Sequence, residues 1–351
     1  MNEFKYICPN CSAALELVKT KYICPKCSAE WGMVEGVARL SRSPSYWSLV
    51  PEAEMKAFLG EVRSRGWKDA VLSSANPKIK ELYTWTDAPS RADGTFYLSL
   101  TPQSSVLDLG SGWGSYTFGL SPRVKQVIAA DSSLGSLEFI SLRAQQDKRG
   151  NVAAVHIEPL DYARLPFPDS AFDAVIMNGV LEWVGSYLKK GDPLKIQRNC
   201  LKEVSRVLKP GGEVLIGIEN RFGLRYILGA PDDHLKYYSS SRSVSYTTLL
   251  PRMIADRICR RTLGVSYRTY THSLWGYRRM LKGAGFKKID FYFPEQDYRA
   301  ISSKIYPLNS NEVRKTLRLR TGSSRWLKLM SLFNLEPALC DSYFIRAGVA
   351  E

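Results

Sequence analysis

Four cysteines near the start of the chain have the spacing of a metal site. They form two pairs, Cys8–Cys11 and Cys24–Cys27, and the segments around them, YICPNCSA and YICPKCSA, are near-copies sixteen positions apart. Thiolates are preferred ligands of Zn²⁺ in structural sites, where protein fills all four positions. The spacing therefore predicts a structural zinc site on Cys8, Cys11, Cys24 and Cys27, with an iron centre or two disulfides as the alternatives.

A second stretch, residues 106–117, has the composition of a nucleotide-binding turn. It reads VLDLGSGWGSYT, an apolar run that ends in three glycines at alternate positions, Gly110, Gly112 and Gly114. Glycines let the backbone turn sharply and approach a ligand, and the helix that follows offers free N–H groups. The spacing differs from the dinucleotide fingerprint G-x-G-x-x-G, and Asp108 already lies inside the strand. The pattern predicts a nucleotide site that holds no pyrophosphate.

Further polar residues follow at the ends of the next predicted strands. The strand 124–131 ends in Asp131, 23 residues beyond Asp108. A carboxylate at the carboxyl end of the second strand of a doubly wound sheet can accept both hydroxyls of an adenosine ribose. Asp161 and Tyr162 precede a Leu-Pro-Phe turn, and Asn178 ends the apolar run that begins at Phe172. Asp161 could alternatively cap a turn.

The order of these segments resembles the class I S-adenosylmethionine-dependent methyltransferases. D-x-G-x-G-x-G at 108–114 is similar to their first motif, and Asp131, the Asp-to-Leu-Pro-Phe segment, Phe172-Asp-Ala-Val and Lys209-Pro-Gly-Gly follow at the usual spacings. The resemblance implies S-adenosylmethionine as cofactor, with Asp161 meeting the adenine amino group, Tyr162 beside the ring and the Asn178 loop along the methionine part. The implied cofactor-binding residues are Asp108, Gly110, Gly112, Gly114, Asp131, Asp161, Tyr162 and Asn178. Many small-molecule members have a histidine where Trp183 stands here.

The predicted fold is α/β, a doubly wound, mostly parallel seven-stranded Rossmann-like methyltransferase sheet with a small N-terminal zinc ribbon. The last strand, 342–347, is expected to be antiparallel and inserted, as in the family. The ribbon also resembles the zinc-binding partner that activates several tRNA and protein methyltransferases, and the ribbon fused to rRNA guanine methyltransferases. The predicted units are a zinc ribbon at 1–42, a helical connector at 43–100 with tryptophans as packing anchors, and a methyltransferase domain at 101–351 with insertions at about 221–272 and 299–335.

Glu219, Asn220 and Arg221 leave the carboxyl end of a predicted strand, where open α/β sheets bind ligands. They are expected to line the acceptor pocket. A sulfonium methyl is already a good electrophile, so the protein mainly aligns the acceptor and removes a proton if that acceptor is a hydroxyl. Of the three histidines, His234 follows two aspartates in the same region and is the expected base, with a structural turn as the alternative. His156 and His272 are expected to be structural.

The charge distribution bears on the acceptor. The net charge is +15, and residues 221–351 carry 23 basic against 10 acidic residues. Such an excess indicates an anionic acceptor, a nucleic acid or an acidic membrane surface. Residues 249–263 predict a basic amphipathic lid helix, with peripheral membrane or partner contact as the alternative. The chain shows no apolar signal segment and no run long enough to span a bilayer, which predicts a cytoplasmic protein.

Three functions fit these patterns. The first is O-methylation of a sugar, glycolipid precursor or other biosynthetic small molecule, free or lipid-linked. The second is methylation of an rRNA or tRNA base, which the ribbon and the basic C-terminal part favour, although the fused-ribbon rRNA enzymes typically have a histidine in the second ligand pair. The third is a non-catalytic zinc-and-cofactor interaction module, against which the intact glycine-rich motif and Asp131 argue.

Overall fold

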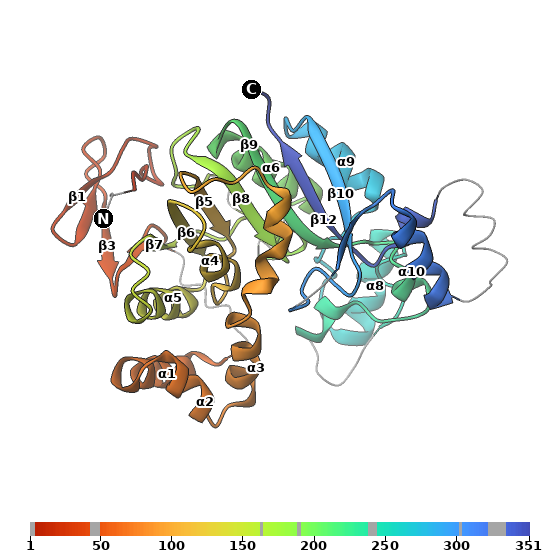
Figure 1. Ribbon diagram of the computed structural model, residues 1–351, viewed down its shortest axis with the longest axis horizontal. Coiled ribbons are helices and arrows are strands. Elements are labelled where there is room, and N and C mark those ends of the chain that lie inside the picture. The colour runs from red at the N-terminus through yellow and green to blue at the C-terminus, as the bar shows by residue number, and fades with distance from the viewer. Residues whose placement is uncertain are drawn as a thin grey trace.

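The computed structural model describes residues 4–42, 50–161, 164–187, 191–237, 244–301, 304–321 and 335–351. A mixed sheet of twelve strands runs through the molecule, with helices on both faces (Figure 1). The strands are β1 (Glu16–Val18), β2 (Lys21–Ile23), β3 (Glu30–Val34), β4 (Val37–Arg39), β5 (Ser105–Leu109), β6 (Gln126–Asp131), β7 (Val152–His156), β8 (Phe172–Asn178), β9 (Leu208–Glu219), β10 (Lys288–Pro294), β11 (Ile305–Pro307) and β12 (Ser342–Gly348).

Helices occur along the chain from residue 52 to residue 339. The α-helices are α1 (Glu52–Arg65), α2 (Trp67–Ser73), α3 (Pro77–Thr86), α4 (Ser115–Leu120), α5 (Leu134–Gln146), α6 (Pro193–Val207), α7 (Leu224–Ile227), α8 (Arg252–Leu263), α9 (Leu274–Gly283) and α10 (Asn311–Thr321). Short 3₁₀ helices are η1 (Pro89–Tyr97), η2 (Leu181–Trp183), η3 (Asp233–Tyr237) and η4 (Glu336–Leu339). Within the described ranges, no helix is both long and apolar enough to cross a bilayer.

The predicted doubly wound core is present at the centre of the sheet. Its order is β7-β6-β5-β8-β9-β12-β10, and β7, β6, β5, β8 and β9 are parallel neighbours. The strand β12 pairs antiparallel with both β9 and β10, so it is inserted between them as expected. The prediction of seven strands was too low, because β1–β4 extend one edge of the sheet and β11 extends the other.

The strand β5 is covered on both of its faces, as a central strand must be. Val106 packs into the cluster that contains α4 and η1, whereas Leu107 and Leu109 pack on the opposite face with residues of α6 and α9. All five residues of β5 are buried. Parallel strands covered on both faces read as continuous apolar runs, so the single carboxylate in this strand, Asp108, marks a special position.

The N-terminal segment that contains the cysteine pairs is joined to the central sheet. Strand β4 pairs in parallel with β7, and the N–H of Leu40 continues the pairing by donating to the carbonyl of His156 at 2.9 Å. The N–H of Ile7 donates to the carbonyl of Pro166 at 3.0 Å. Without β4, β7 would be an exposed edge strand with unpaired backbone groups, so the ribbon covers that edge.

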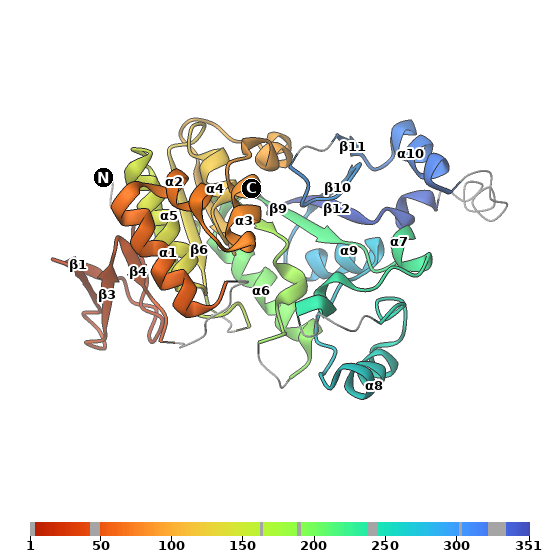
Figure 2. The same cartoon turned by 90° about the horizontal axis from the view of Figure 1, so that it is seen from below.

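Residues 50–97 are mainly helical, and the helices α1 and α2 pack against α5 (Figure 2). Trp67 is buried between α2 and α5, and its indole N–H donates to Asp147 at 2.8 Å. It therefore anchors the connector to the central sheet through α5, while Trp47 lies outside the described residues. Arg63 on α1 pairs with Glu35 in the ribbon at 3.5 Å, so the connector touches the ribbon too.

The first predicted insertion forms α7, η3 and α8 beyond the carboxyl end of β9 (Figures 1 and 2). Helix α8 begins at Arg252, three residues later than the start predicted from the sequence. The reason is Pro251, which takes the position before the helix and disfavours helical backbone in the residue preceding it. The described part of the second predicted insertion contains β11 and α10.

Candidate functional site

The two cysteine pairs lie in two turns with the same backbone geometry. The N–H of Ser12 donates to the carbonyl of Cys8 at 2.8 Å, and the N–H of Ser28 donates to the carbonyl of Cys24 at 2.9 Å. Both serines have positive φ, 62° and 57°. The sequence repeat is therefore a structural repeat, and each copy presents two thiols on one side of its turn.

The four sulfur atoms converge. The Sγ atoms of Cys8 and Cys27 are 3.6 Å apart, those of Cys11 and Cys24 are 3.4 Å apart, and all four lie within 4.8 Å of one another. A tetrahedral Zn²⁺ with bonds of about 2.3 Å needs sulfur–sulfur separations of roughly 3.8 Å. The donor set and its spacing fit zinc with little movement, and they do not have disulfide geometry.

The glycine-rich turn connects the ends of β5 and β6. The N–H of Gly110 donates to the carbonyl of Ala130 at 2.8 Å. The N–H of Gly112 donates to one oxygen of Asp131, and the N–H of Ser133 donates to the other, each at 2.8 Å. Because an ionised carboxylate has about four acceptor positions, Asp131 can hold this turn and still accept hydroxyl donors of a ligand.

The glycines of the turn differ in what surrounds them. A Cβ on Gly110 would lie 2.5 Å from the side chain of Val180, whereas a Cβ on Gly112 would meet nothing within 4 Å. Gly114, with a φ of +82°, precedes α4 and is tightly packed. The Oγ of Ser111 is buried and has no hydrogen-bond partner in the described structure. The open space at Gly112 and the unpaired Ser111 hydroxyl fit a close-lying polar ligand.

Asp108 lies beneath the turn. Its carboxylate is 3% exposed and accepts from the hydroxyl of Thr117 on α4 at 2.5 Å. Burial raises the pKa of Asp108 to about 7, although the hydrogen bonds from Thr117 act in the opposite direction. The structure thus gives Asp108 the role of fixing the start of α4, and its predicted contact with the cofactor stays a prediction.

The remaining predicted cofactor residues lie near the same edge of the sheet. A carboxylate oxygen of Asp161 accepts from the N–H of Gly185 at 2.7 Å, so this residue does hold a turn. The Oδ1 of Asn178, at the end of β8, accepts from the hydroxyl of Tyr116 at 3.1 Å. Tyr162 lies outside the described residues.

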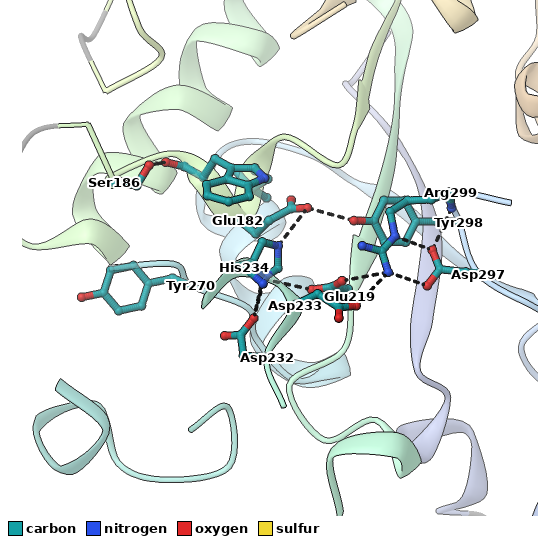
Figure 3. Close-up of polar contacts among 12 residues, drawn as sticks. Glu182, Ser186, Glu219, Asp232, Asp233, His234, Tyr270, Asp297, Tyr298 and Arg299 are labelled. Carbon is teal, nitrogen blue, oxygen red and sulfur yellow. Dashed lines mark hydrogen bonds and ion pairs between the residues drawn. The ribbon is translucent and has the colours of Figure 1, made fainter. Parts of the chain in front are cut away.

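His234 is the centre of a buried charged cluster on the acceptor side (Figure 3). It is 3% exposed, and its Nδ1 lies 2.7 Å from an oxygen of Asp232 and 3.4 Å from an oxygen of Glu219. Its Nε2 faces Glu182 at 3.8 Å, and its ring packs edge-on against Trp183 with centroids 4.8 Å apart. Many small-molecule members of the family that the sequence resembles have a histidine at the position of Trp183. In this chain His234, from another segment, packs directly against Trp183.

Two arginines and a tyrosine contact the carboxylates of Glu219 and Glu182. Arg225 and Arg299 approach one oxygen of Glu219 at 3.1 and 3.5 Å, and the second oxygen of Glu219 is buried without a hydrogen bond. The hydroxyl of Tyr298 donates to one oxygen of Glu182 at 3.0 Å, and the other oxygen of Glu182 is likewise buried without a hydrogen bond. Two buried carboxylate oxygens of the cluster therefore accept no hydrogen bond, although that of Glu219 lies 3.4 Å from the Nδ1 of His234.

The electrostatics of the cluster favour a charged imidazole. Burial by itself lowers the pKa of His234, but Glu219 and the contacts to Asp232 and Glu182 outweigh it and hold this pKa well above its ordinary value. Burial raises the pKa of Glu219, against the effect of the neighbouring cations. Burial also acts to raise the pKa of Asp232, but hydrogen bonds from His234 and Tyr267 lower it.

Two of the three predicted acceptor-wall residues are placed differently from expectation. The side-chain amide of Asn220 donates to the carbonyls of Ala338 and Cys340, both at 2.7 Å, and its oxygen accepts from the N–H of Phe222 at 3.1 Å. All its polar atoms are used, so Asn220 holds the chain around β12 and does not offer its amide to an acceptor. Arg221 points toward the insertion and donates to the carbonyl of Leu250 at 2.6 Å. Of the three predicted wall residues, Glu219 is the one in the charged cluster.

The other two histidines each contact an oxygen acceptor elsewhere in the fold. The Nε2 of His156 lies 3.2 Å from the carbonyl of Ser132, and the Nε2 of His272 lies 2.7 Å from the side-chain oxygen of Gln197. The cluster includes residues that sequence reasoning did not select, namely Glu182, Arg225, Asp297, Tyr298 and Arg299. Glu182 lies in the segment after Asn178 and could have been noticed there, whereas residues 297–299 carry no pattern that points to a site.

The cluster also has the composition of a cation site. One ligand atom each from Glu219, Asp232 and His234 lie within 4.8 Å of one another, and all three residues are buried. However, the Nδ1 of His234 already occupies this space with its contact to Asp232, and Arg225 and Arg299 supply positive charge to Glu219. The charged imidazole of His234 and the guanidinium groups of Arg225 and Arg299 therefore balance the charge of these carboxylates.

Comparison with known proteins identifies the central part of the chain. Residues 107–216 match a family model described as "Methyltransferase domain", which is less than a third of the chain. A demethylmenaquinone methyltransferase of Clavibacter sepedonicus is 38% identical over 164 residues, which are 46% of this chain and 57% of that protein. The biotin biosynthesis bifunctional protein BioHC of Cellvibrio japonicus is 31% identical over 130 residues, which are 36% of this chain and 22% of that protein.

Solved structures include distant likenesses as well. The phosphoethanolamine N-methyltransferase 2 of Haemonchus contortus, in complex with phosphomonomethylethanolamine and S-adenosylhomocysteine, is 16% identical with a TM-score of 0.44. The match covers 87% of this chain and 62% of that one, and at this TM-score we draw no conclusion from it. The match to the methyltransferase domain model lies on the sheet around β5–β9, and the chain spans 57% and 22% of the two curated relatives cited above.

Proposed function

We propose that this chain, built around a methyltransferase domain, transfers a methyl group from S-adenosylmethionine to a hydroxyl of a small-molecule or lipid-linked acceptor. The observation that carries the first half of the proposal is the glycine-rich turn, in which Gly112 faces open space beside Asp131. In this proposal Asp131 accepts the ribose hydroxyls, the unpaired hydroxyl of Ser111 meets a polar group of the ligand, and Asp161 and Asn178 border the site. The bound sulfonium compound supplies an electrophilic methyl group.

The second half of the proposal concerns the acceptor proton. The carboxylate of Asp232 holds the Nδ1 side of His234, which leaves Nε2 facing the Glu182 oxygen that also accepts from Tyr298. A hydroxyl that enters beside His234 can donate its one proton to a deprotonated Nε2, and the carboxylate of Glu182 then stabilises the imidazolium that forms. His234 then acts as general base, Asp232 orients it, and the contact between Tyr298 and Glu182 fixes the position of the second carboxylate.

The names of the relatives and the small number of polar groups in the cluster support the proposed acceptor class. Several of the curated relatives are named demethylmenaquinone methyltransferases, a name that refers to a small-molecule acceptor. The cluster offers a few buried polar atoms, which suits one hydroxyl group of a small acceptor. Among small molecules, a sugar, a glycolipid precursor or another biosynthetic metabolite fits the proposal.

The experiment that tests the acceptor class compares strains with and without the protein. Mass spectrometry of metabolites, lipid-linked intermediates and RNA nucleosides should find a small molecule that is heavier by one CH₂ only when the protein is present. A difference confined to an RNA nucleoside would establish base methylation instead. In that case RNA affinity should also fall with salt, with a log–log slope near roughly −0.7 per neutralised phosphate.

We also propose that Cys8, Cys11, Cys24 and Cys27 hold one Zn²⁺ with a structural role. Four protein ligands leave no open position for a substrate, so such an ion stabilises the ribbon and takes no part in methyl transfer. Because β4 pairs with β7, the ribbon that this ion stabilises also protects an edge of the catalytic sheet.

A further inference from the structure

Exposed apolar side chains are concentrated in one part of the described chain. Fifteen large hydrophobic residues are exposed, and seven of them lie between residues 222 and 275. These seven are Phe222, Ile227, Leu228, Tyr246, Met253, Ile254 and Trp275. Met253 is 86% exposed and Leu228 is 67% exposed, so these side chains are not the edges of a core. A gathering of exposed apolar residues on one segment indicates an interaction surface.

Contacts within this region bring three of its segments together. The guanidinium of Arg221 donates to the carbonyls of Leu249 and Leu250, immediately before α8, and its backbone N–H donates to the carbonyl of His272. The hydroxyl of Tyr246 lies 2.9 Å from the position that a Cβ on Gly229 would take, which places this tyrosine beside the end of α7. The exposed residues of 222–228, 246–254 and 275 therefore belong to neighbouring segments.

The charge of this region is positive on the outside. Residues 221–275 contain nine basic and three acidic residues. The three acidic residues face inward or are paired: Asp232 is buried, Asp233 pairs with Arg225 and Arg299, and Asp256 pairs with Arg260. Among the described residues of this region, the exposed basic side chains are Arg257, Arg260 and Arg261 of α8.

Helix α8 combines both features on one face. It buries Ala255 and Cys259 against the body of the insertion. Met253 and Ile254 are exposed at its first turn, and Arg257 and Arg261 are exposed on the same outer side in the following turns. A surface helix with apolar residues and arginines on its outer face is suited to the boundary between lipid headgroups and acyl chains.

We propose that the outer face of α8, with the exposed residues of α7 and of the segment around Tyr246, is a docking surface for an anionic lipid bilayer. The apolar side chains enter the headgroup region, the arginines contact lipid phosphates, and the aromatic rings of Tyr246 and Trp275 are suited to the same depth. The described helices include none that spans a bilayer, so the attachment is peripheral.

This surface adjoins the acceptor side of the site. The same insertion carries Asp232 and His234, and Arg221 leads from the carboxyl end of β9 to the start of α8. A protein docked through α8 would meet a lipid-linked acceptor at the membrane surface. The inference goes beyond the proposed methyl transfer. Methyl transfer to a soluble acceptor would not require membrane binding, so the two claims can fail separately.

The test is flotation of the full-length protein with phosphatidylcholine vesicles, with and without phosphatidylglycerol. We expect binding to the anionic vesicles and little to the neutral ones. Arg257→Glu with Arg261→Glu should weaken binding by about 30-fold or more, since each arginine or lysine near an anionic surface contributes a factor of about five. Met253→Asp with Ile254→Asp should weaken binding to the same vesicles without changing the number of basic residues.

Matched controls lie on the connector helices. Leu72→Asp changes an exposed apolar residue of α2, and Lys78→Glu with Lys80→Glu reverses two charges of α3. These variants should bind anionic vesicles like the unchanged protein, and all variants should keep their melting temperature and their affinity for S-adenosylhomocysteine. Absence of vesicle binding by the unchanged protein, equal binding by the α8 variants, or α8-dependent binding of RNA in place of vesicles would overturn the proposal.

Discussion

The cofactor side and the acceptor side of this site are constructed in opposite ways. The proposed cofactor side is a backbone structure, in which one contiguous stretch, residues 108–117, turns between β5 and α4 and leaves open space at Gly112. The acceptor side is a side-chain structure. Its members come from η2, from the end of β9, from the insertion and from the segment after β10. The first surface is shaped by glycines, and the second by charges buried together.

Because of this difference, a substitution is expected to have a different kind of effect on each side. On the cofactor side a substitution acts through shape, since a single added carbon fills space that the ligand needs. On the acceptor side it acts through charge and proton position, because each carboxylate affects the pKa of His234. If the two sides are independent, a variant of one should leave the measured property of the other unchanged.

The largest expected effect is on turnover. His234→Ala should reduce the rate of methyl transfer to the acceptor by about 10²–10⁴-fold, the usual contribution of a general base. Calorimetry should find its affinity for S-adenosylhomocysteine unchanged. Turnover close to that of the unchanged protein would remove His234 from the chemistry, and a loss of cofactor affinity would mean that the two sides are coupled.

The next effect is on cofactor affinity. Asp131→Ala removes an acceptor of two hydrogen bonds to the ribose, each contributing roughly 1.5–3 kcal/mol when charge-assisted, so affinity should fall by about 10²-fold or more. Asp131→Asn keeps the size of the side chain and its contact with Gly112, and should show a smaller loss. Equal affinities in a calorimetric titration of all three proteins would contradict the ribose assignment.

The sequence was a good guide to one side and a poor guide to the other for a physical reason. The turn at Gly110–Gly114 depends on local backbone conformation, which adjacent residues specify, so its position, Asp131 and the following helix could all be predicted. The cluster depends on which segments the fold brings together. Tyr298 and Arg299 are near His234 because β10 ends beside the insertion, and no spacing in the sequence encodes that.

The ribbon illustrates the same limit. The paired cysteines predicted a local structure, and the two matching turns are present. The pairing of β4 with β7 depends on 115 or more residues of intervening chain and could not be predicted from the cysteine pattern. Asn220 is a second example, because its amide is used by carbonyls near residue 340, more than a hundred positions later.

Zinc should matter for stability and little for the cofactor. Elemental analysis is expected to find one zinc per chain, and Cys24→Ser should lose it together with several degrees of melting temperature, because structural zinc contributes directly to folding. Cofactor affinity should change by no more than about threefold, since the ribbon contacts the sheet at β7, away from the glycine-rich turn. A full equivalent of zinc in the variant would contradict the ligand assignment.

The pH dependence gives the smallest but most specific effect. A base must lose its proton before it acts, so the rate should rise with pH along a limb centred above the ordinary histidine pKa of about 6.5. Asp232→Asn removes a negative charge that favours the imidazolium, which lowers the pKa of His234 and should move the limb to lower pH by about one unit or more. A limb that stays in place would show that another group titrates.

The central claim is that the turn at Gly112 is the cofactor site, and the most direct measurement compares Gly112→Ala with the unchanged protein. The new Cβ meets nothing within 4 Å in the protein, so the melting temperature should fall by only a few degrees, as a left-handed residue costs about 1–2 kcal/mol. Gly110→Ala, whose Cβ would strike Val180, should be far less stable. We predict that calorimetry finds one S-adenosylhomocysteine per unchanged chain and at least tenfold weaker binding by folded Gly112→Ala. Binding of equal strength by both proteins, or none by the unchanged protein, would contradict the account.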